Sequence, residues 1–88
     1  MKTRFEISKE VFLDNGTLPE CYEYYEKYLK QCGFVLDKER EEVFKEFDRS
    51  IILNEGDRIV MDGIGVKIIT GKYYDIDNDI MIYILEEE

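Results

Sequence analysis

The C-terminal half of the chain alternates short apolar runs with turn-forming residues. β-Branched and aromatic residues dominate four segments, which are 51–53, 58–61, 66–76 and 80–85. Runs of this kind, bounded by Gly, Asp and Asn, are typical of β-strands. Gly56 and the dipeptide Asp62-Gly63 supply the positive φ angles that tight connections between strands need. The pattern therefore predicts a four-stranded antiparallel meander.

The two longest runs indicate a curved and covered sheet. Gly71 lies in the middle of 66–76, where a glycine usually marks a bulge or a sharp bend. Residues 80–85 are apolar at both odd and even positions, which is typical of a strand buried on both faces. We therefore expect the meander to curl toward a small barrel, with a helix covering the strand 80–85.

The N-terminal part of the chain predicts a strand and then a helix. Residues 3–7 alternate weakly, with Phe5 and Ile7 on one side, as in a short strand added at a sheet edge. The segment 17–20 matches a capping box. Apolar residues then recur at three- and four-residue intervals as far as Cys32, and Gly33 is suited to ending the helix. This stripe includes three tyrosines, which we expect to pack against the sheet.

Residues 37–48 fit two different structures. Val43, Phe44 and Phe47 follow a charged run at helical spacing, which favours a second amphipathic helix. The alternative is a hairpin, with strands at 34–36 and 43–47 around a charged loop at 37–42. We favour the helix. The predicted fold is therefore α+β, with the N-terminal strand and one or two helices packed on the meander.

Length and composition place the chain among ordinary globular domains. With 88 residues, 44% of them hydrophobic and 38% charged, it is expected to form one domain that buries about 60–65% of its unfolded surface. It has no apolar run of about 18 residues and no apolar leader at its start, so we expect it neither to span a membrane nor to be secreted.

The two cysteines, Cys21 and Cys32, both fall in the predicted helix. Eleven residues of helix correspond to about 16 Å, well beyond the roughly 7 Å between Cα atoms that a disulfide can bridge. We therefore expect unpaired thiols and a cytoplasmic protein.

Few residues of the chain could carry catalysis. It contains no histidine, so the commonest general base and metal ligand is missing. Ser8 and Ser50 lack the glycine-flanked turn that presents a hydrolase nucleophile. We therefore predict a protein that is not an enzyme and uses no cofactor.

One segment partly matches a calcium-binding loop. Asp75, Asp77, Asp79 and Glu86 occupy four of the positions that ligate calcium in such loops. However, Ile80 stands where the sharp turn of the loop requires glycine. We therefore expect no metal to bind there.

The net charge of −9 is unevenly distributed. It argues against direct binding to nucleic acid, which requires clustered Lys and Arg. Residues 73–88 contain six acidic residues and no basic one. Tyr24 is the tyrosine of the predicted helix that falls clearly off its apolar stripe. The candidate partner-binding residues are Asp75, Asp77, Asp79, Glu86, Glu87, Glu88 and Tyr24.

Two segments, LNEGDRI (53–59) and YYDIDND (73–79), together with Tyr83, resemble short uncharacterised proteins of bacteriophages and gut-bacterial mobile elements. The resemblance covers only the C-terminal part of the chain, and it implies a small curled β unit without an established activity.

We therefore predict a small acidic cytoplasmic protein, phage-like in its C-terminal part, that acts by binding another protein. One alternative is an acidic decoy that occupies the nucleic-acid-binding groove of a basic protein. Another is a subunit of a phage assembly, which would self-associate through its apolar strand edges.

Overall fold

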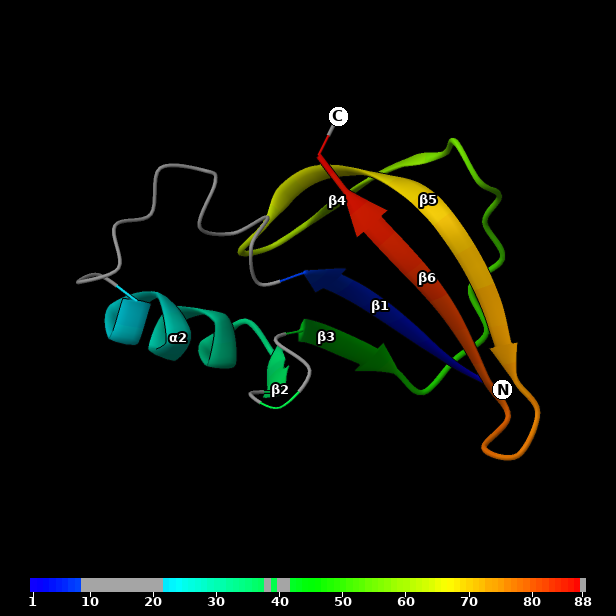
Figure 1. Cartoon of the computed structure of the whole chain (residues 1–88), viewed down its shortest axis with the longest axis horizontal. Coiled ribbons are helices and arrows are strands. Elements are labelled where there is room, and N and C mark those ends of the chain that lie inside the picture. Colours follow the sequence, from blue (N-terminus) through cyan, green and yellow to red (C-terminus); the bar gives the residue numbers. More distant parts are fainter. Residues whose placement is uncertain (9–21, 38, 40–41, 88) are drawn as a thin grey trace.

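The computed structural model describes residues 1–8, 22–37, 39 and 42–87. This part of the chain forms six strands and one helix: β1 (Lys2–Ser8), α2 (Tyr22–Gln31), β2 (Val35–Asp37), β3 (Glu42–Phe47), β4 (Arg58–Met61), β5 (Gly65–Asp75) and β6 (Ile80–Glu86). The strands make a single sheet in the order β2-β3-β1-β6-β5-β4 (Figure 1).

The sheet is mixed, and it differs from the predicted four-stranded meander. Four of the five described strand pairs are antiparallel, so an antiparallel sheet is confirmed in outline. The fifth pair, between β1 and β6, is parallel and lies in the centre of the sheet. The prediction of an α+β fold with one or two helices on a four-stranded meander is therefore wrong. The prediction of β1 as an edge strand is wrong too.

Residues 51–53 do not form the strand that the sequence predicts. Their backbone bonds to side chains of the sheet and not to a neighbouring strand. The Ile51 N–H donates to Thr3 Oγ1 at 3.0 Å, and the Leu53 N–H donates to the Tyr83 hydroxyl at 3.0 Å. The meander consequently has three strands, β4, β5 and β6. In the part of the chain that the structure describes, the sheet is open, with β2 and β4 as its edges.

Residues 42–47 form strand β3, so the favoured second helix is wrong and the alternative hairpin is correct. β3 pairs antiparallel with both β2 and β1. Val43 and Phe47 are four residues apart, a spacing that places two side chains on one face of a helix and also on one face of a strand. Phe44, which suited the helical stripe, points to the opposite face of the sheet in β3.

The predicted bulge at Gly71 is confirmed. The register of β5 against β6 shifts between Ile69 and Gly71, and Gly71 lies opposite Ile84. A Cβ atom on Gly71 would come within 3.1 Å of Ile84 Cγ1, so the close approach favours glycine here. Because the bulge adds one residue, it reverses the side-chain alternation along β5. Ile69 faces the core, whereas Tyr73 faces the opposite side.

The hydrophobic core lies on one face of the sheet. Its centre is the ring of Phe5, which stacks on Tyr83 at 5.4 Å and meets Phe47 edge-on at 5.8 Å between centroids. Helix α2 lies beside the β2 edge (Figure 1) and contributes Leu29 to this core. The described helix thus does not cover the far face of β6, and the prediction of a helix over the strand 80–85 does not hold for α2.

The predicted first helix is present as α2, and Gly33 follows it with a φ of 93°. The capping box at 17–20 and Cys21 lie outside the described residues, so the spacing of the two cysteines stays a prediction. Cys32 is a free thiol close to the tip of the β4–β5 hairpin, since a Cβ atom on Gly63 would lie 3.3 Å from its Sγ. Among the described residues, no helix is long and apolar enough to cross a membrane.

Candidate binding surface on the outer face of the sheet

The predicted acidic residues fall at opposite ends of β6. Asp75, Asp77 and Asp79 lie at or in the turn between β5 and β6, while Glu86 and Glu87 follow at the far end of the strand. A strand rises about 3.3 Å per residue, so about 20 Å separates the two groups. The structure therefore does not gather them into one cluster. Tyr24 lies on α2, but its side chain and all of Glu88 are outside the described part.

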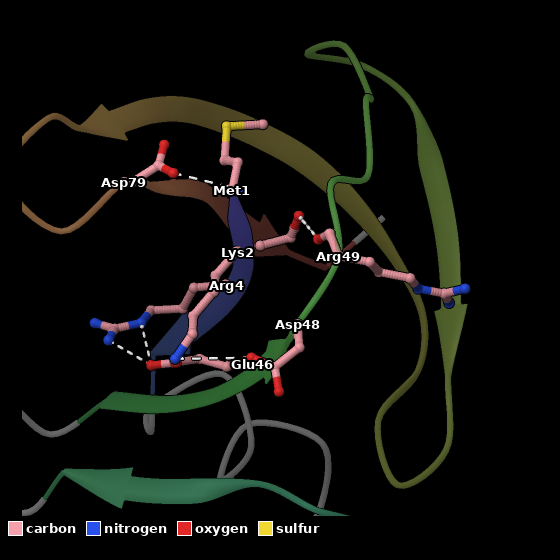
Figure 2. Close-up of polar contacts among 8 residues, drawn as sticks. Met1, Lys2, Arg4, Glu46, Asp48, Arg49 and Asp79 are labelled. Carbon is pink, nitrogen blue, oxygen red and sulfur yellow. Dashed lines mark hydrogen bonds and ion pairs between the residues drawn. The ribbon is translucent and has the colours of Figure 1, made fainter.

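Two of the three turn aspartates stabilise the turn itself. The carboxylate of Asp75 accepts hydrogen bonds from the backbone and the side chain of Asn78, at 3.2 and 2.9 Å. Asp79 has a positive φ and accepts a hydrogen bond from the Tyr74 hydroxyl. It also lies 3.5 Å from the amino group of Met1 (Figure 2). The side-chain amide of Asn78 holds the pKa of Asp75 below its usual value, and the Tyr74 hydroxyl does the same for Asp79.

The Tyr74–Asp79 pair gives a prediction for the turn. The carboxylate of Asp79 accepts the phenolic hydrogen bond and raises the pKa of Tyr74 above its ordinary 10.0. We expect Asp79→Asn to bring that pKa back toward the ordinary value, because an amide carries no charge that opposes the phenolate. The absorbance of phenolate, followed against pH, measures the change, and Tyr74→Phe assigns the signal.

The sign of the linked stability follows from the raised pKa. The stabilisation from this pair is fully present below the ordinary pKa of tyrosine and is lost as pH rises through the raised value. Asp77→Asn serves as the control, because Asp77 does not contribute to the raised pKa of Tyr74. An unchanged Tyr74 titration in Asp79→Asn would show that the hydrogen bond is not formed in solution.

The side of the sheet opposite the core, here called the outer face, carries apolar side chains on three neighbouring strands, β4, β5 and β6. Strand register places Tyr73 beside Ile82 and Val60 beside Val66. Val60 is 75% exposed, Tyr73 63% and Val66 50%, and the isoleucines between them are half-buried. We call this surface the outer stripe, and its residues are Val60, Val66, Ile68, Tyr73, Ile82 and Ile84.

Two carboxylates on the outer face border the part of the outer stripe that lies on β5 and β6. Asp75 follows Tyr73 by two positions on β5, and Glu86 follows Ile84 by two positions on β6, so each lies on the outer face. Glu87 belongs to the core side, where it lies 3.0 Å from Lys67 Nζ. Both bordering carboxylates are among the candidate residues predicted from the sequence. The apolar residues between them are not, because the pattern of 80–85 predicts a strand covered on both faces.

The long side of the outer stripe, along β1 and β3, is also rich in carboxylates. Arg4 lies 4.4 Å above the ring of Phe44 and pairs with Glu46, and it reaches Glu6 at 3.6 Å. Lys2 lies 3.7 Å from Asp48 (Figure 2). Both basic residues on this side, Lys2 and Arg4, are therefore paired with carboxylates. Arg58 on β4 is the third basic residue on the described outer face, and it lies across Ile68 from Glu86 in the register.

Other kinds of site are not found in the part of the chain that the structure describes. Neither a pocket nor a group of three metal-ligating side chains occurs there. The four carboxylates of the partial calcium loop are divided between the two ends of β6. None of the family models, curated proteins and solved structures compared with this chain gives a match.

Proposed function

We propose that this protein acts by binding another protein through the outer face of its sheet. The observation that carries the proposal is the outer stripe, which presents three large exposed side chains on one surface. An antiparallel sheet usually turns polar residues toward water on its second face. A contiguous apolar surface with a polar border is typical of a protein interaction site.

The charge around the outer stripe indicates what kind of partner it suits. With Asp75 and Glu86 on its border and a net charge of −9, the surface would attract a partner that carries Lys or Arg beside an apolar centre. Complementary charge of this kind acts mainly on the rate of encounter and on specificity. A cytoplasmic setting is consistent with the free thiol of Cys32.

The outer stripe favours a protein that binds its partner through apolar contacts over an acidic decoy of nucleic acid, because apolar side chains lie between Asp75 and Glu86. We propose a role without catalysis. In view of the resemblance to phage and mobile-element proteins, a component of such an assembly is the first class of partner to test.

The experiment compares two doubly substituted proteins that carry the same change in charge. Val66→Lys with Tyr73→Lys places two cations in the outer stripe. Ile52→Lys with Ile76→Lys places two cations at positions that are 81% and 80% exposed and lie outside the stripe. Each tagged protein is used to capture proteins from the native host, and the captured protein is then purified and titrated directly.

We expect the stripe variant to lose about 10-fold or more in affinity, because a central apolar contact is worth about 2 kcal/mol. The control variant should bind within about twofold of the unchanged protein, as expected for substitutions outside an interface. Circular dichroism establishes that both variants fold. Equal affinity of the two variants for the captured protein would exclude the outer face as the binding surface.

A further inference from the structure

We infer that the partner places an amphipathic α-helix across the outer stripe, with its apolar side on the sheet and Lys or Arg residues near both ends. This inference rests on the proposed function and specifies the class of partner segment. It follows from the dimensions of the stripe, from the positions of its carboxylates, and from the hydrogen-bonding needs of a chain lying on a sheet face.

A helix fits the face of a sheet better than an extended peptide does. An extended peptide lying on the face would bury backbone N–H and C=O groups that the sheet cannot pair, whereas a helix satisfies these groups internally. The stripe crosses β4, β5 and β6, and three strands spaced about 4.8 Å apart span about 10 Å. This width matches the diameter of a helix with its side chains, about 10 Å.

The described helix leaves this position open. α2 lies beside the β2 edge (Figure 1), and Leu29 near its end packs in the core by the tip of the β4–β5 hairpin, whereas Val60 and Tyr73 of the outer stripe are 75% and 63% exposed. Small domains usually bury a sheet face against a second layer, and a helix is a common second layer. A helix supplied by the partner would therefore add a second layer on the outer face, where the described part of the chain provides none.

The spacing of the bordering carboxylates sets the spacing of the expected cations. Asp75 lies opposite Ile80 in the register, and Glu86 lies six positions further along β6, a distance of about 20 Å. On a helix, residues about 14 positions apart are about 21 Å apart and point to the same side, since 14 residues make almost four turns. A helix with cations at this spacing would place one beside each carboxylate.

A second copy of this chain fits the stripe less well. Two outer faces in contact would bring like-charged carboxylates together at their borders, and each copy carries a net charge of −9. Like charges brought together at an interface oppose association. Self-association through the stripe is consequently an outcome that the experiment must be able to detect.

The test uses three labelled synthetic helical peptides and the full-length protein. All three have the same apolar side. The first carries Lys residues about 14 positions apart, and the second carries them about 7 positions apart. The third carries Glu in place of Lys at the wide spacing. Fluorescence anisotropy gives each affinity at several salt concentrations.

We expect the widely spaced Lys peptide to bind about 10-fold more tightly than either of the others, a difference of about 1.4 kcal/mol. Val66→Lys with Tyr73→Lys should abolish this binding, and Ile52→Lys with Ile76→Lys should retain it. Asp75→Asn with Glu86→Gln should remove the preference for wide spacing and flatten the salt dependence. Asp77→Asn with Glu55→Gln, which alters two exposed carboxylates outside the outer face, should leave both unchanged.

Several results would overturn the inference, and they separate it from the proposed function. Equal affinity for the two Lys spacings, or no binding of any peptide, would exclude the helix with spaced cations. If the captured host protein still depended on the outer stripe, the proposed function would stand without it. If sedimentation shows self-association that Val66→Lys with Tyr73→Lys abolishes, the occupant is a second copy. If the stripe variant captured the host protein as well as the unchanged protein does, both the inference and the proposed function would be excluded.

Discussion

Replacing Tyr83 by alanine is expected to lower the free energy of unfolding by about 3–5 kcal/mol. Tyr83 is 1% exposed and lies on β6 at the centre of the sheet, where its ring stacks on Phe5. A chain of this length has a total stability of about 4–13 kcal/mol. The variant should therefore be close to unfolding, which urea denaturation followed by circular dichroism measures.

The hydroxyl of Tyr83 makes a separate contribution. It donates to the carbonyl of Ile51 at 2.7 Å and accepts from the Leu53 N–H at 3.0 Å, which holds the segment 51–53 against the core face. Tyr83→Phe keeps the ring and leaves these two backbone groups without this partner, at an expected cost of about 1–3 kcal/mol. Tyr73→Phe is the matched control on an exposed tyrosine and should change stability by less than about 0.5 kcal/mol. Equal stability of the two Phe variants would contradict this role of the hydroxyl.

The strands β4, β5 and β6 could be predicted because their turn chemistry is local. Gly56 and Gly63 indicate two turns and Gly71 indicates a bulge, and all three features depend on residues close in sequence. The parallel pairing of β1 with β6 depends on residues at opposite ends of the chain. Residues 3–7 carry no local pattern that distinguishes a central strand from an edge strand. Arg4 is a charged residue of the kind expected on an edge strand, but here it contacts Phe44 and Glu46 on the neighbouring strand β3.

The errors over 42–47 and 51–53 have different physical causes. In the first segment, Val43 and Phe47 share a face at a spacing that helix and strand have in common, so periodicity cannot separate the two structures. In the second, the apolar run suits a strand, but Thr3 and Tyr83 supply the hydrogen bonds that a neighbouring strand would otherwise provide. Such bonds between distant side chains and backbone are set by the tertiary structure.

The candidate site could be predicted only in part. The acidic residues Asp75 and Glu86 were found from their charge alone, without regard to the face on which they lie. Their common position on the outer face depends on the bulge at Gly71, which reverses the alternation before Tyr73 and Asp75. The sequence predicts the bulge but not which face of the sheet is buried. The residues of the outer stripe therefore cannot be grouped on one face from the sequence alone.

Breaking the ion pair between Lys67 and Glu87 is also expected to lower the free energy of unfolding substantially. Lys67 is 4% exposed on the core side, and its Nζ lies 2.8 Å from the carbonyl oxygen of Ile64 and 3.0 Å from Glu87 Oε1. Glu87→Ala leaves a buried ammonium without its counter-charge, which costs about 3–5 kcal/mol when both partners are buried. Because the Glu87 side chain is 46% exposed, screening by water reduces the expected cost to about 1–3 kcal/mol.

A double-mutant cycle isolates the pair from the other contacts of Glu87. Lys67→Met replaces the ammonium with an apolar chain of similar length and should leave stability nearly unchanged or raise it slightly, since the cost of burying the charge disappears. In that background Glu87→Ala should cost much less than it does alone, and Glu86→Ala, at an exposed position, should cost little in either background. Additive effects of Lys67→Met and Glu87→Ala in urea denaturation would show that the ion pair does not contribute. A clear coupling would show that the end of β6 is fastened to β5 by a charge buried on the core side, opposite the outer stripe.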